Sequence, residues 1–422
     1  MKTDVVIVGA GLAGLVCAQD LTRAGVDCCL IEASDGVGGR VRSDTLDGFI
    51  LDRGFQILLS AYPQVQQRID IEGLELGYFE PGAMVRANGR FHRVADPLRR
   101  PSQIAQTLTA PIGSLGEKAR MARLVLDVRM SSVRSILRRP DGTTAERLAG
   151  AGLTDRSIDL FWGPLFAGIQ LDPELEVSSR RFETILRMLA VGQTGLPRRG
   201  MGAIPAQIAA TLPEHLLRLC APVALVEQAG VVLDSGERIA SRAVVVATDG
   251  PTAHHLLGKR VGDPGSRAAA CCWFSAPEAP MPGPTLILDG ESGGPALNMV
   301  VMSEVSPSYA PPGRSLVAAA VPGPRALEPG ITSAVSEQLA QCFGSMTGDW
   351  ELLRTDVIPH GQPAQLPALN PRKRVALGDG LFVCGDHRDT ASLQGAMFSG
   401  ERVAGAVLTH LHGQRSLRLS AA

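Results

Sequence analysis

Residues 4–43, DVVIVGAGLAGLVCAQDLTRAGVDCCLIEASDGVGGRVRS, combine two apolar runs with two groups of glycines. The apolar run at 5–8 predicts a strand that is buried on both faces, as in a parallel sheet. The pattern of 12–23 predicts a helix that ends at Gly25, and residues 27–31 predict a second strand. This order of elements predicts an α/β fold with a parallel sheet.

The first glycine group matches the pattern GxGxxG at the turn between strand and helix. Gly9 permits the tight turn, Gly11 lets the backbone approach a pyrophosphate, and Gly14 lets the helix pack closely against the sheet. Amides at the start of the helix, at Leu12 and Ala13, direct donors and the positive end of the helix dipole toward the same anion. The turn therefore predicts a dinucleotide site.

An acid ends the second strand. Glu32 stands about 20 residues beyond the glycines, where a carboxylate accepts hydrogen bonds from the hydroxyls of an adenosine ribose. The same charge disfavours a 2′-phosphate, because two anions would face each other. A glycine turn with a purely structural role would not require this acid. The combination favours dinucleotide binding in a Rossmann-like domain, with Ala33 at the same contact.

The second glycine group extends this site beyond what a nicotinamide dinucleotide needs. Gly38 and Gly39 allow backbone to lie against a ligand, and Arg40 offers two parallel donors to a second phosphate. The sequence DRG follows at 52–54. At this spacing the two motifs resemble those of the FAD-dependent flavin amine oxidase and phytoene desaturase superfamily, which implies FAD as the cofactor and Gly54 as part of its site.

Two central segments continue the resemblance. Residues 200–209, GMGAIPAQIA, resemble the family's glycine-rich turn and the helix that returns to the cofactor domain. The resemblance then implies that Val223 lies where the family places backbone against the adenine. Residues 241–253 predict a buried strand that ends at Ala247, which the resemblance marks as a further cofactor contact.

Residues 380–411 predict an apolar strand, a Gly-Asp turn and a long helix with small residues on one face. In the family, the acid at the position of Asp386 holds the flavin ribityl chain. Amides at the start of the helix face the pyrimidine carbonyl of the flavin, where a helix N-terminus stabilises negative charge on the reduced ring. By position, the other contacts implied at this end are Gly385, Leu393, Gln394 and Ala396.

The positions of these motifs imply a discontinuous FAD-binding domain. We expect its Rossmann-like α/β fold to contain residues 1–85, 195–270 and 355–422. The remaining pieces, 86–194 and 271–354, are expected to form an α+β substrate-binding domain. Within them, FWGPLFAGIQLDPELEVSSRRF and VSPSYAPPG are similar to segments of unassigned bacterial members related to phytoene desaturases.

The resemblance implies an enzyme that passes a hydride from a C–H bond to flavin N5. Amine oxidases of the superfamily usually carry a flavin-facing lysine and two aromatic rings along the amine's approach. None of the four lysines occupies a convincing position for that role, and Ser392 stands where the second ring belongs. These differences favour a dehydrogenase of the desaturase type that acts on a hydrophobic small molecule, such as a carotenoid or terpenoid.

Other activities remain as alternatives. The superfamily also contains amine and amino-acid oxidases, porphyrinogen oxidases that use oxygen, and flavin-dependent isomerases. A non-catalytic escort protein for lipidated or prenylated partners uses the same fold, but such proteins have typically lost the flavin contacts that this sequence keeps at Glu32, Arg40 and Asp386. No second GxGxxG follows a strand, so we expect reoxidation by oxygen, a quinone or another electron carrier.

Two further features have both a functional and a structural interpretation. The run FWGPLFAGI at 161–169 either lines a site for an apolar substrate or belongs to the core. His360 either acts as an acid–base group or substrate contact at the flavin's face, or packs as part of a wall. His387 is expected to be a contact of the cofactor domain, and the sequence identifies no other candidate for catalysis.

Composition disfavours several classes of function. The net charge of −1 and the 4% of aromatic residues argue against a nucleic-acid partner. The eight cysteines form no CxxC pair and no cluster with zinc-ligand spacing, so no metal site is predicted. No GxSxG, Walker A or HExxH motif appears, which disfavours hydrolases and kinases. Reduced cysteines and the absence of a signal peptide lead us to expect a cytoplasmic protein.

One basic stretch bears on the expected location of the protein in the cell. Residues 86–139 contain 12 Lys or Arg and three acids, with apolar residues at helical spacing. Such a stretch, at 99–139, can contact an anionic membrane peripherally and admit a lipid-soluble substrate. The alternative is the solvated face of a helix in the substrate domain.

Overall fold

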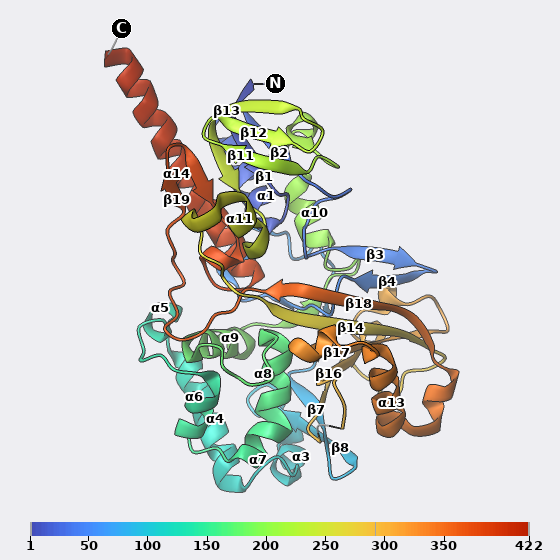
Figure 1. The fold of residues 1–422 in the computed structure, drawn as a ribbon. Helices are drawn as coiled ribbons and strands as arrows, with labels where there is room; N and C mark the ends of the chain where they lie inside the picture. The colour runs from blue at the N-terminus through green and yellow to red at the C-terminus, as the bar shows by residue number, and fades with distance from the viewer. Residues whose placement is uncertain (1, 292, 421–422) are drawn as a thin grey trace.

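Two large β-sheets, one above the other in Figure 1, organise the protein. The computed structural model describes residues 2–291 and 293–420. The first sheet consists of β1 (Lys2–Val8), β2 (Cys28–Ile31), β10 (Leu217–Arg218), β11 (Val223–Glu227), β12 (Gly230–Leu233), β13 (Arg238–Val246), β19 (Ala376–Gly378) and β20 (Leu381–Val383). Its order is β10-β2-β1-β13-β12-β11, with β20 beside β13 and β19 beside β20.

The centre of this sheet is parallel. β1 pairs in parallel with β2 and β13, β2 with β10, and β13 with β20, whereas β11 and β12 form an antiparallel extension. Residues 5–8 of β1 and all of β2 are buried, as their apolar runs predict. The α/β fold class with a Rossmann-like first domain is therefore confirmed.

The register of the parallel strands places four chain segments at one edge of the sheet. Val8 lies opposite Ile31 and Val246, and Val246 lies opposite Val383. All four residues end their strands, so the loops that follow them begin side by side. Ligands of open α/β sheets bind at this carboxyl edge.

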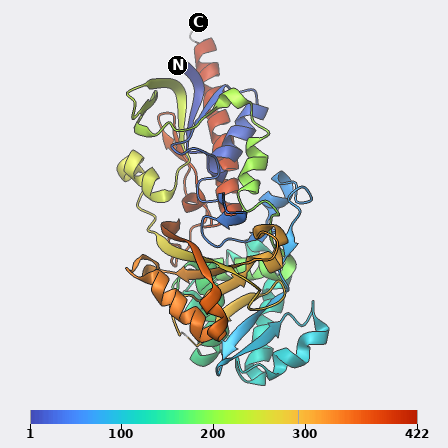
Figure 2. The same cartoon turned by 90° about the vertical axis from the view of Figure 1, so that its right-hand side faces the viewer.

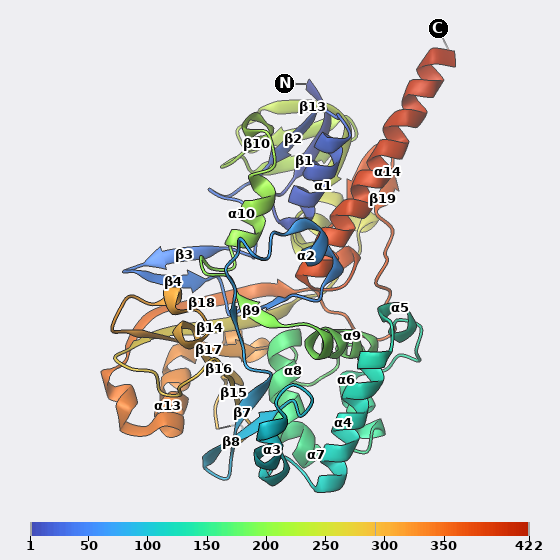
Figure 3. The ribbon, with the colours of Figure 1, turned by 180° about the vertical axis from the view of Figure 1, so that it is seen from behind.

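The second sheet contains β7 (Gly82–Ala87), β8 (Arg90–Ala95), β14 (Arg267–Ala276), β15 (Leu286–Asp289), β16 (Asn298–Val301), β17 (Ser315–Pro322) and β18 (Glu351–Gln362). Its order is β18-β14-β17-β16-β15-β7-β8; β15 and β7 pair in parallel and the other neighbours are antiparallel. Two small sheets are β3 (Ser43–Leu46) with β4 (Phe49–Asp52), and β5 (Leu58–Leu59) and β6 (Gly77–Tyr78) with β9 (Thr194–Leu196); β3, β4 and β9 lie at mid-height in Figure 3.

The helices are α1 (Leu12–Arg23), α2 (Pro63–Arg68), α3 (Ile104–Thr109), α4 (Leu115–Met130), α5 (Val133–Ile136), α6 (Thr144–Gly150), α7 (Asp155–Ser157), α8 (Gly163–Gln170), α9 (Ser179–Val191), α10 (Ala203–Ala209), α11 (Gly250–Leu257), α12 (Met302–Val305), α13 (Ile331–Phe343) and α14 (Leu393–Ser420). None of those within the described residues is both long and apolar enough to cross a bilayer. Helices α3 to α9 and helix α13 lie on different sides of the second sheet (Figure 2).

Alternating residues of the second sheet face these two groups of helices. Val85 and Leu288 pack in the same core cluster as Phe182 of α9, whereas Ile287 packs with Val335 of α13. Neighbouring strand residues point to opposite faces, so the sheet separates two cores. The helical core on the α9 side forms one wall of the site described below.

Helices α1 and α14 pack against each other on one face of the first sheet (Figure 3). A Cβ added to Gly400 would come within 2.3 Å of the carbonyl oxygen of Ala13, so the two backbones are in direct contact. Val403 and Val407 of α14 belong to the same buried cluster as Leu15 of α1. The C-terminal helix is thus anchored beside the N-terminal glycine turn.

Two of the expected domain boundaries need correction. β14 and β18 pair with each other in the second sheet, with Ala270 opposite Val357. The expected boundaries at 270 and 355 therefore fall inside a pair of strands that belongs to the substrate side. The motifs did not locate these boundaries, because strand pairing between distant parts of the chain leaves no local signal in the sequence.

Candidate flavin and substrate site

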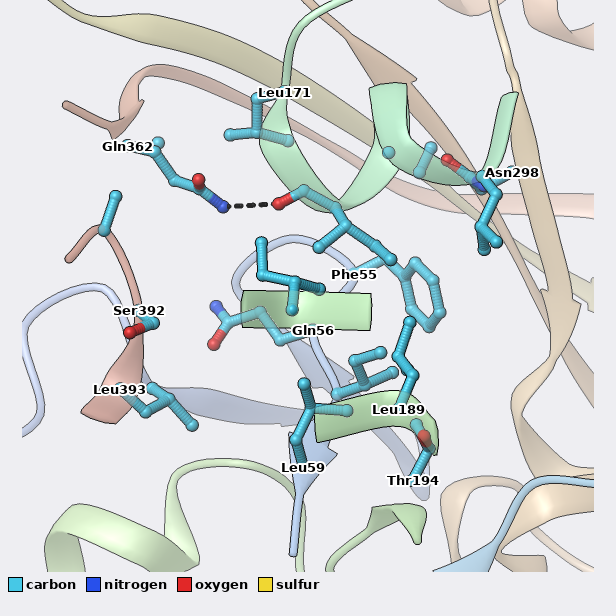
Figure 4. A pocket seen from close by; sticks show the side chains of 18 of the residues that line it. Phe55, Gln56, Leu59, Leu171, Leu189, Thr194, Asn298, Gln362, Ser392 and Leu393 are labelled. Carbon is cyan, nitrogen blue, oxygen red and sulfur yellow. Dashed lines mark hydrogen bonds between the residues drawn. The ribbon is translucent and has the colours of Figure 1, made fainter. Parts of the chain in front are cut away.

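A cavity of about 1430 Å³ lies between the two sheets. Its lining begins at the carboxyl edge of the first sheet and continues to α3, α4 and α8 beside the second. In Figure 4, Gln362, Ser392 and Leu393 lie toward one side of the pocket and Phe55 and Leu189 toward the other. One continuous cavity therefore joins the predicted cofactor segments to the part of the molecule expected to bind substrate.

Most of the predicted cofactor contacts line this cavity. They come from segments far apart in the chain, which the parallel strands bring to one edge. The predicted residues found in the lining are Gly9, Gly11, Leu12, Ala13, Glu32, Ala33, Gly38, Gly39, Arg40, Gly54, Val223, Ala247, Gly385, Asp386, Leu393 and Ala396.

The three glycines of the first turn differ in their surroundings. Gly9 has a φ of +102°, and a Cβ there would lie 3.0 Å from the carbonyl oxygen of Ala247. A Cβ at Gly14 would come within 1.9 Å of the carbonyl oxygen of Gly9, so Gly14 serves helix packing and does not line the cavity. At Gly11 a Cβ would meet nothing within 4 Å. This open backbone beside the start of α1 fits a pyrophosphate.

Glu32 is held at the edge of the cavity by three hydrogen bonds. One carboxylate oxygen accepts from the backbone N of Ala10 at 2.7 Å. The other accepts from the backbone N and the hydroxyl of Ser34, at 2.9 and 2.8 Å. These contacts fix the carboxylate after β2, in the position from which an acid meets a ribose.

Arg40 joins the two ends of the chain. Its Nη2 donates to Oδ1 of Asp386 at 2.8 Å, and its Nη1 donates to the carbonyl oxygen of Gly361 at 2.7 Å. Both Nη atoms thus bind protein acceptors, which differs from the predicted role of a fork on the second phosphate. Burial alone would raise the pKa of Asp386, but the charge and hydrogen bond of Arg40 outweigh burial and lower it. Asp386 is therefore an ionised acceptor in the cavity wall.

The start of α14 has one predicted contact that turns away from the cavity. The side chain of Gln394 accepts a hydrogen bond from the backbone N of Gln64 at 2.8 Å, and Gln394 is not part of the lining. The hydroxyl of Ser392 accepts from the backbone N of Gly395 at 3.1 Å and so caps the helix. Ser392, Leu393 and Ala396 line the cavity at the start of this helix.

His360 lies outside the cavity. Its side chain is exposed and its Nδ1 is 2.9 Å from the hydroxyl of Ser266. An irregularity in the pairing of β14 with β18 precedes Gln362, and Ile358 and Gln362 line the cavity on either side of it. This bulge turns His360 outward, so the hypothesis of an acid–base role is not supported.

Arg181 and Gln362 also line the cavity, although no sequence motif predicts them. Arg181, on α9, lines the cavity and is 2% exposed. Its Nη2 donates to the side-chain oxygen of Gln362 and to the carbonyl oxygen of Ala391. Gln362 in turn donates to the carbonyl oxygen of Ile169 at 2.9 Å, the dashed line of Figure 4. The local feature of the sequence that points to Arg181 is the presence of an arginine, beside Phe182, on the apolar face of α9.

The end of the cavity beside α3, α4 and α8 is apolar. We call this part the apolar chamber, defined by Ile104, Leu108, Ile112, Leu115, Met121, Val125, Leu126, Phe161, Trp162, Leu165 and Ile169. The run at 161–169 contributes both to the cavity lining and to the buried core, through different residues. Phe161, Leu165 and Ile169 line the chamber, whereas Phe166 is fully buried and its ring centroid is 4.4 Å from that of Phe182.

Comparison with known proteins agrees with this site. Residues 12–408 match the family described as flavin containing amine oxidoreductase, and the chain belongs to this family. The expected superfamily is confirmed, and FAD is its cofactor. The residues that fit FAD are the glycine turn at 9–14, which we call the glycine cradle, the fixed carboxylate of Glu32 and the N-terminus of α14.

Curated relatives match parts of the chain. Putrescine oxidase of Kocuria rosea is 43% identical over 75 residues, which are 18% of this chain and 16% of that protein. Phytoene dehydrogenase of Streptomyces griseus is 27% identical over 288 residues, which are 60% of this chain and 56% of that protein. The alignments thus span about half or less of the length of these relatives.

Solved structures match nearly the whole chain. An oxidoreductase from Methanosarcina mazei has a TM-score of 0.72 at 19% identity, over 96% of this chain and 99% of that chain. A putrescine oxidase bound to putrescine has a TM-score of 0.70 at 18% identity, over 97% and 99%. At such identities the similarity shows the fold.

Proposed function

We propose that this protein is an FAD-dependent dehydrogenase of the desaturase type that acts on a hydrophobic small molecule. The observation that carries the proposal is one continuous cavity that contains both the glycine cradle and the apolar chamber. Bound FAD supplies the redox chemistry by accepting a hydride. The residues of the chain hold the cofactor, orient the substrate in the chamber and exclude water from the reacting bond.

The polar groups in the outer part of the cavity support an apolar substrate, because they already have partners in the protein. Arg99 forms an ion pair with Asp96, at 3.3 Å between Nε and Oδ2. Glu80 forms an ion pair with Arg100, at 2.6 Å. Lys118 donates to two carbonyl oxygens at the end of α3. A substrate that entered here would meet mainly hydrocarbon, which favours apolar groups by burial of surface.

An amine or porphyrinogen oxidase is the second candidate, and the relatives named above include a putrescine oxidase. The lysine that lines the cavity is Lys118, and its ammonium group is bound to carbonyl oxygens on the α3 side of the chamber. Ser392 lines the cavity where an amine oxidase of the superfamily would carry an aromatic ring. Both observations favour a desaturase over an amine oxidase. A non-catalytic escort protein is the alternative of another class.

The test is anaerobic reduction of the purified, FAD-loaded protein by three substrate classes: polyenes in detergent, porphyrinogens and amines. We expect polyenes alone to bleach the flavin absorption. Bleaching by amines would establish the oxidase alternative, and a protein that binds no FAD would establish the escort. Ala122→Trp, which fills the chamber from α4, should slow bleaching by polyenes without loss of FAD. Ala105→Trp, exposed on α3 and outside the lining, is the matched control.

The electron acceptor is proposed to be oxygen, a quinone or another carrier. Reoxidation of the reduced protein by each in turn, followed by stopped-flow absorbance, ranks them. A lipid-soluble quinone could use the same apolar chamber as the substrate, whereas a carrier protein would require a surface of its own.

We further propose that the mouth of the apolar chamber meets an anionic membrane. Five large apolar residues are exposed to solvent and also line the cavity: Leu98, Ile104, Leu108, Leu115 and Leu126. Leu115, at the start of α4, is 65% exposed. Arg120 and Arg123, which follow on the same helix, have exposed side chains. Apolar groups at an opening with basic neighbours are the pattern of a peripheral membrane contact, through which a lipid-soluble substrate could enter.

A further inference from the structure

Arg181 brings a buried positive charge to the junction between the cofactor end of the cavity and the apolar chamber. Its Nη2 donates to Gln362 and to the carbonyl oxygen of Ala391, the latter at 2.8 Å. Its Nη1 is buried and has no hydrogen-bond partner among the described residues. Arg181, Gln362 and Ala391 all line the cavity, so this unpartnered donor lies within the cavity wall.

The protein does not compensate this charge with a carboxylate of its own. The acids whose charges act on Arg181 are Asp386 and Asp172, which pair with Arg40 at 2.8 Å and with Arg267 at 3.2 Å. Burial lowers the pKa of Arg181 to about 10, so the guanidinium is still cationic at neutral pH. A buried cation that lacks a counter-ion is costly, and a ligand that supplies an acceptor relieves that cost.

We propose that the isoalloxazine ring of bound FAD supplies this acceptor, and that Arg181 provides a fixed positive charge for the reduced ring. The inference rests on the proposed function, since it requires FAD in the cavity. Ala391, which holds the guanidinium, is two positions before Leu393, where the flavin ring is predicted to meet the start of α14. Arg181 thus reinforces the dipole of α14 from a second element, α9.

FAD is the favoured partner over a polar group of the substrate because the charge is present at all times. A substrate would offer an acceptor only while bound, whereas the ring of a resident cofactor offers its acceptor atoms in the resting enzyme as well. A cation that is fixed before the reaction stabilises developing negative charge without reorganisation. The expected consequence is a higher reduction potential for the bound flavin than the same cavity would give without Arg181.

The experiment compares the wild-type protein with Arg181→Met, Arg181→Lys and the control Arg187→Met, all loaded with FAD. Arg187 lies on the same helix and donates to the carbonyl oxygen of Val128 at 3.1 Å, outside the cavity lining. Two readouts need no substrate: the midpoint potential against reference dyes, and the dissociation constant of sulfite, which adds to oxidised flavin as an anion. FAD content and thermal unfolding of each variant report whether it has folded.

In Arg181→Met we expect a lower potential and a sulfite dissociation constant raised about 10- to 100-fold, the usual effect of losing one hydrogen bond to a charged group. Arg181→Lys should recover most of the sulfite affinity, and Arg187→Met should behave as wild type. Unchanged potential and sulfite affinity in a folded, FAD-loaded Arg181→Met would overturn the inference. A protein that holds no FAD at all would instead refute the proposed function.

Discussion

Arg40 and Asp386, 346 positions apart in the sequence, form an ion pair of 2.8 Å in the wall of the cavity. The pair closes the cofactor site from both ends of the chain, and Asp386 is 5% exposed. Arg40 also binds the carbonyl oxygen of Gly361, a residue of β18 that lines the cavity. One side chain therefore ties the two sheets together at the predicted cofactor site.

Removing Asp386 should weaken both the fold and FAD retention. In Asp386→Ala, we expect the free energy of unfolding to fall by about 1.5–3 kcal/mol, the contribution of a hydrogen bond to a charged group. Urea unfolding of the FAD-free protein measures this. A double-mutant cycle with Arg40→Ala should give a coupling energy clearly different from zero, and additive effects would show that the two residues act independently.

Glu32→Ala should weaken FAD binding, because the amide of Ala10 holds the carboxylate at the predicted position of the adenosine ribose. The expected loss is about 1.5–3 kcal/mol, or roughly 10- to 100-fold in the dissociation constant. Fluorescence titration of the FAD-free protein measures it. Asp35→Ala is the control, since the side chain of Asp35 is 76% exposed. Equal affinity of Glu32→Ala and wild type would rule out the ribose contact.

Two glycines of α14 should respond in opposite ways to alanine. A Cβ at Gly400 would lie 2.3 Å from the carbonyl oxygen of Ala13, so Gly400→Ala must separate α14 from α1. A Cβ at Gly405 would meet nothing within 4 Å, and Gly405→Ala should stabilise the helix by about 0.5–1 kcal/mol. Thermal unfolding should therefore fall for Gly400→Ala and hold or rise for Gly405→Ala. A similar change in both variants would contradict the close contact of the helices.

His387 should make stability depend on pH. It is 1% exposed, and neither of its ring nitrogens has a hydrogen-bond partner among the described residues. Burial lowers its pKa from 6.5 to about 4. Between these values the unfolded chain binds more protons than the folded one, so the contribution of His387 is complete above pH 6.5 and is lost as the pH falls toward 4.

The measurement is urea unfolding of wild type and His387→Leu from pH 8 to pH 4.5. Leu fits a site where the ring nitrogens have no partners, so it should cost little at pH 8. The variant should lose less stability on acidification, by up to about 1.4 kcal/mol per pH unit. Burial raises the pKa of Asp52 and Asp389 to about 6. These two acids make stability fall as the pH rises, which is opposite to the effect of His387. They are present in both proteins, so their contribution cancels in the comparison. Parallel curves would show that His387 does not titrate as described.

Binding to anionic vesicles should depend on the mouth of the apolar chamber. Wild type should sediment with vesicles of phosphatidylglycerol and phosphatidylcholine, and less with phosphatidylcholine alone or at high salt. Leu108→Glu with Leu115→Glu should reduce this binding, because both side chains are exposed at the opening. Leu225→Glu is the control, since Leu225 is 50% exposed on β11, outside the cavity lining. Absence of vesicle binding by the wild type would refute the membrane contact. The exposed apolar residues would then be assigned to a contact with a protein partner.

The N-terminal half of the cofactor site could be predicted because its determinants are local. Strand, glycine turn, helix and acid lie within residues 4–32, and each constrains its neighbours through backbone geometry and hydrogen bonds that short segments specify. The small residues of α14 and the Gly-Asp turn at 385–386 likewise carry their own signal, and the resemblance to a family supplied the partner for each.

The features that could not be predicted depend on contacts between distant segments. Arg40 meets Asp386 instead of a phosphate, a bulge between β14 and β18 turns His360 outward, and burial on α9 makes Arg181 part of the site. The exposure and partners of such side chains follow from strand register and helix packing across the whole chain, which no local pattern encodes. Local sequence therefore predicted FAD and the glycine turn expected to hold it, while long-range packing set the shape, charge and entrance of the cavity.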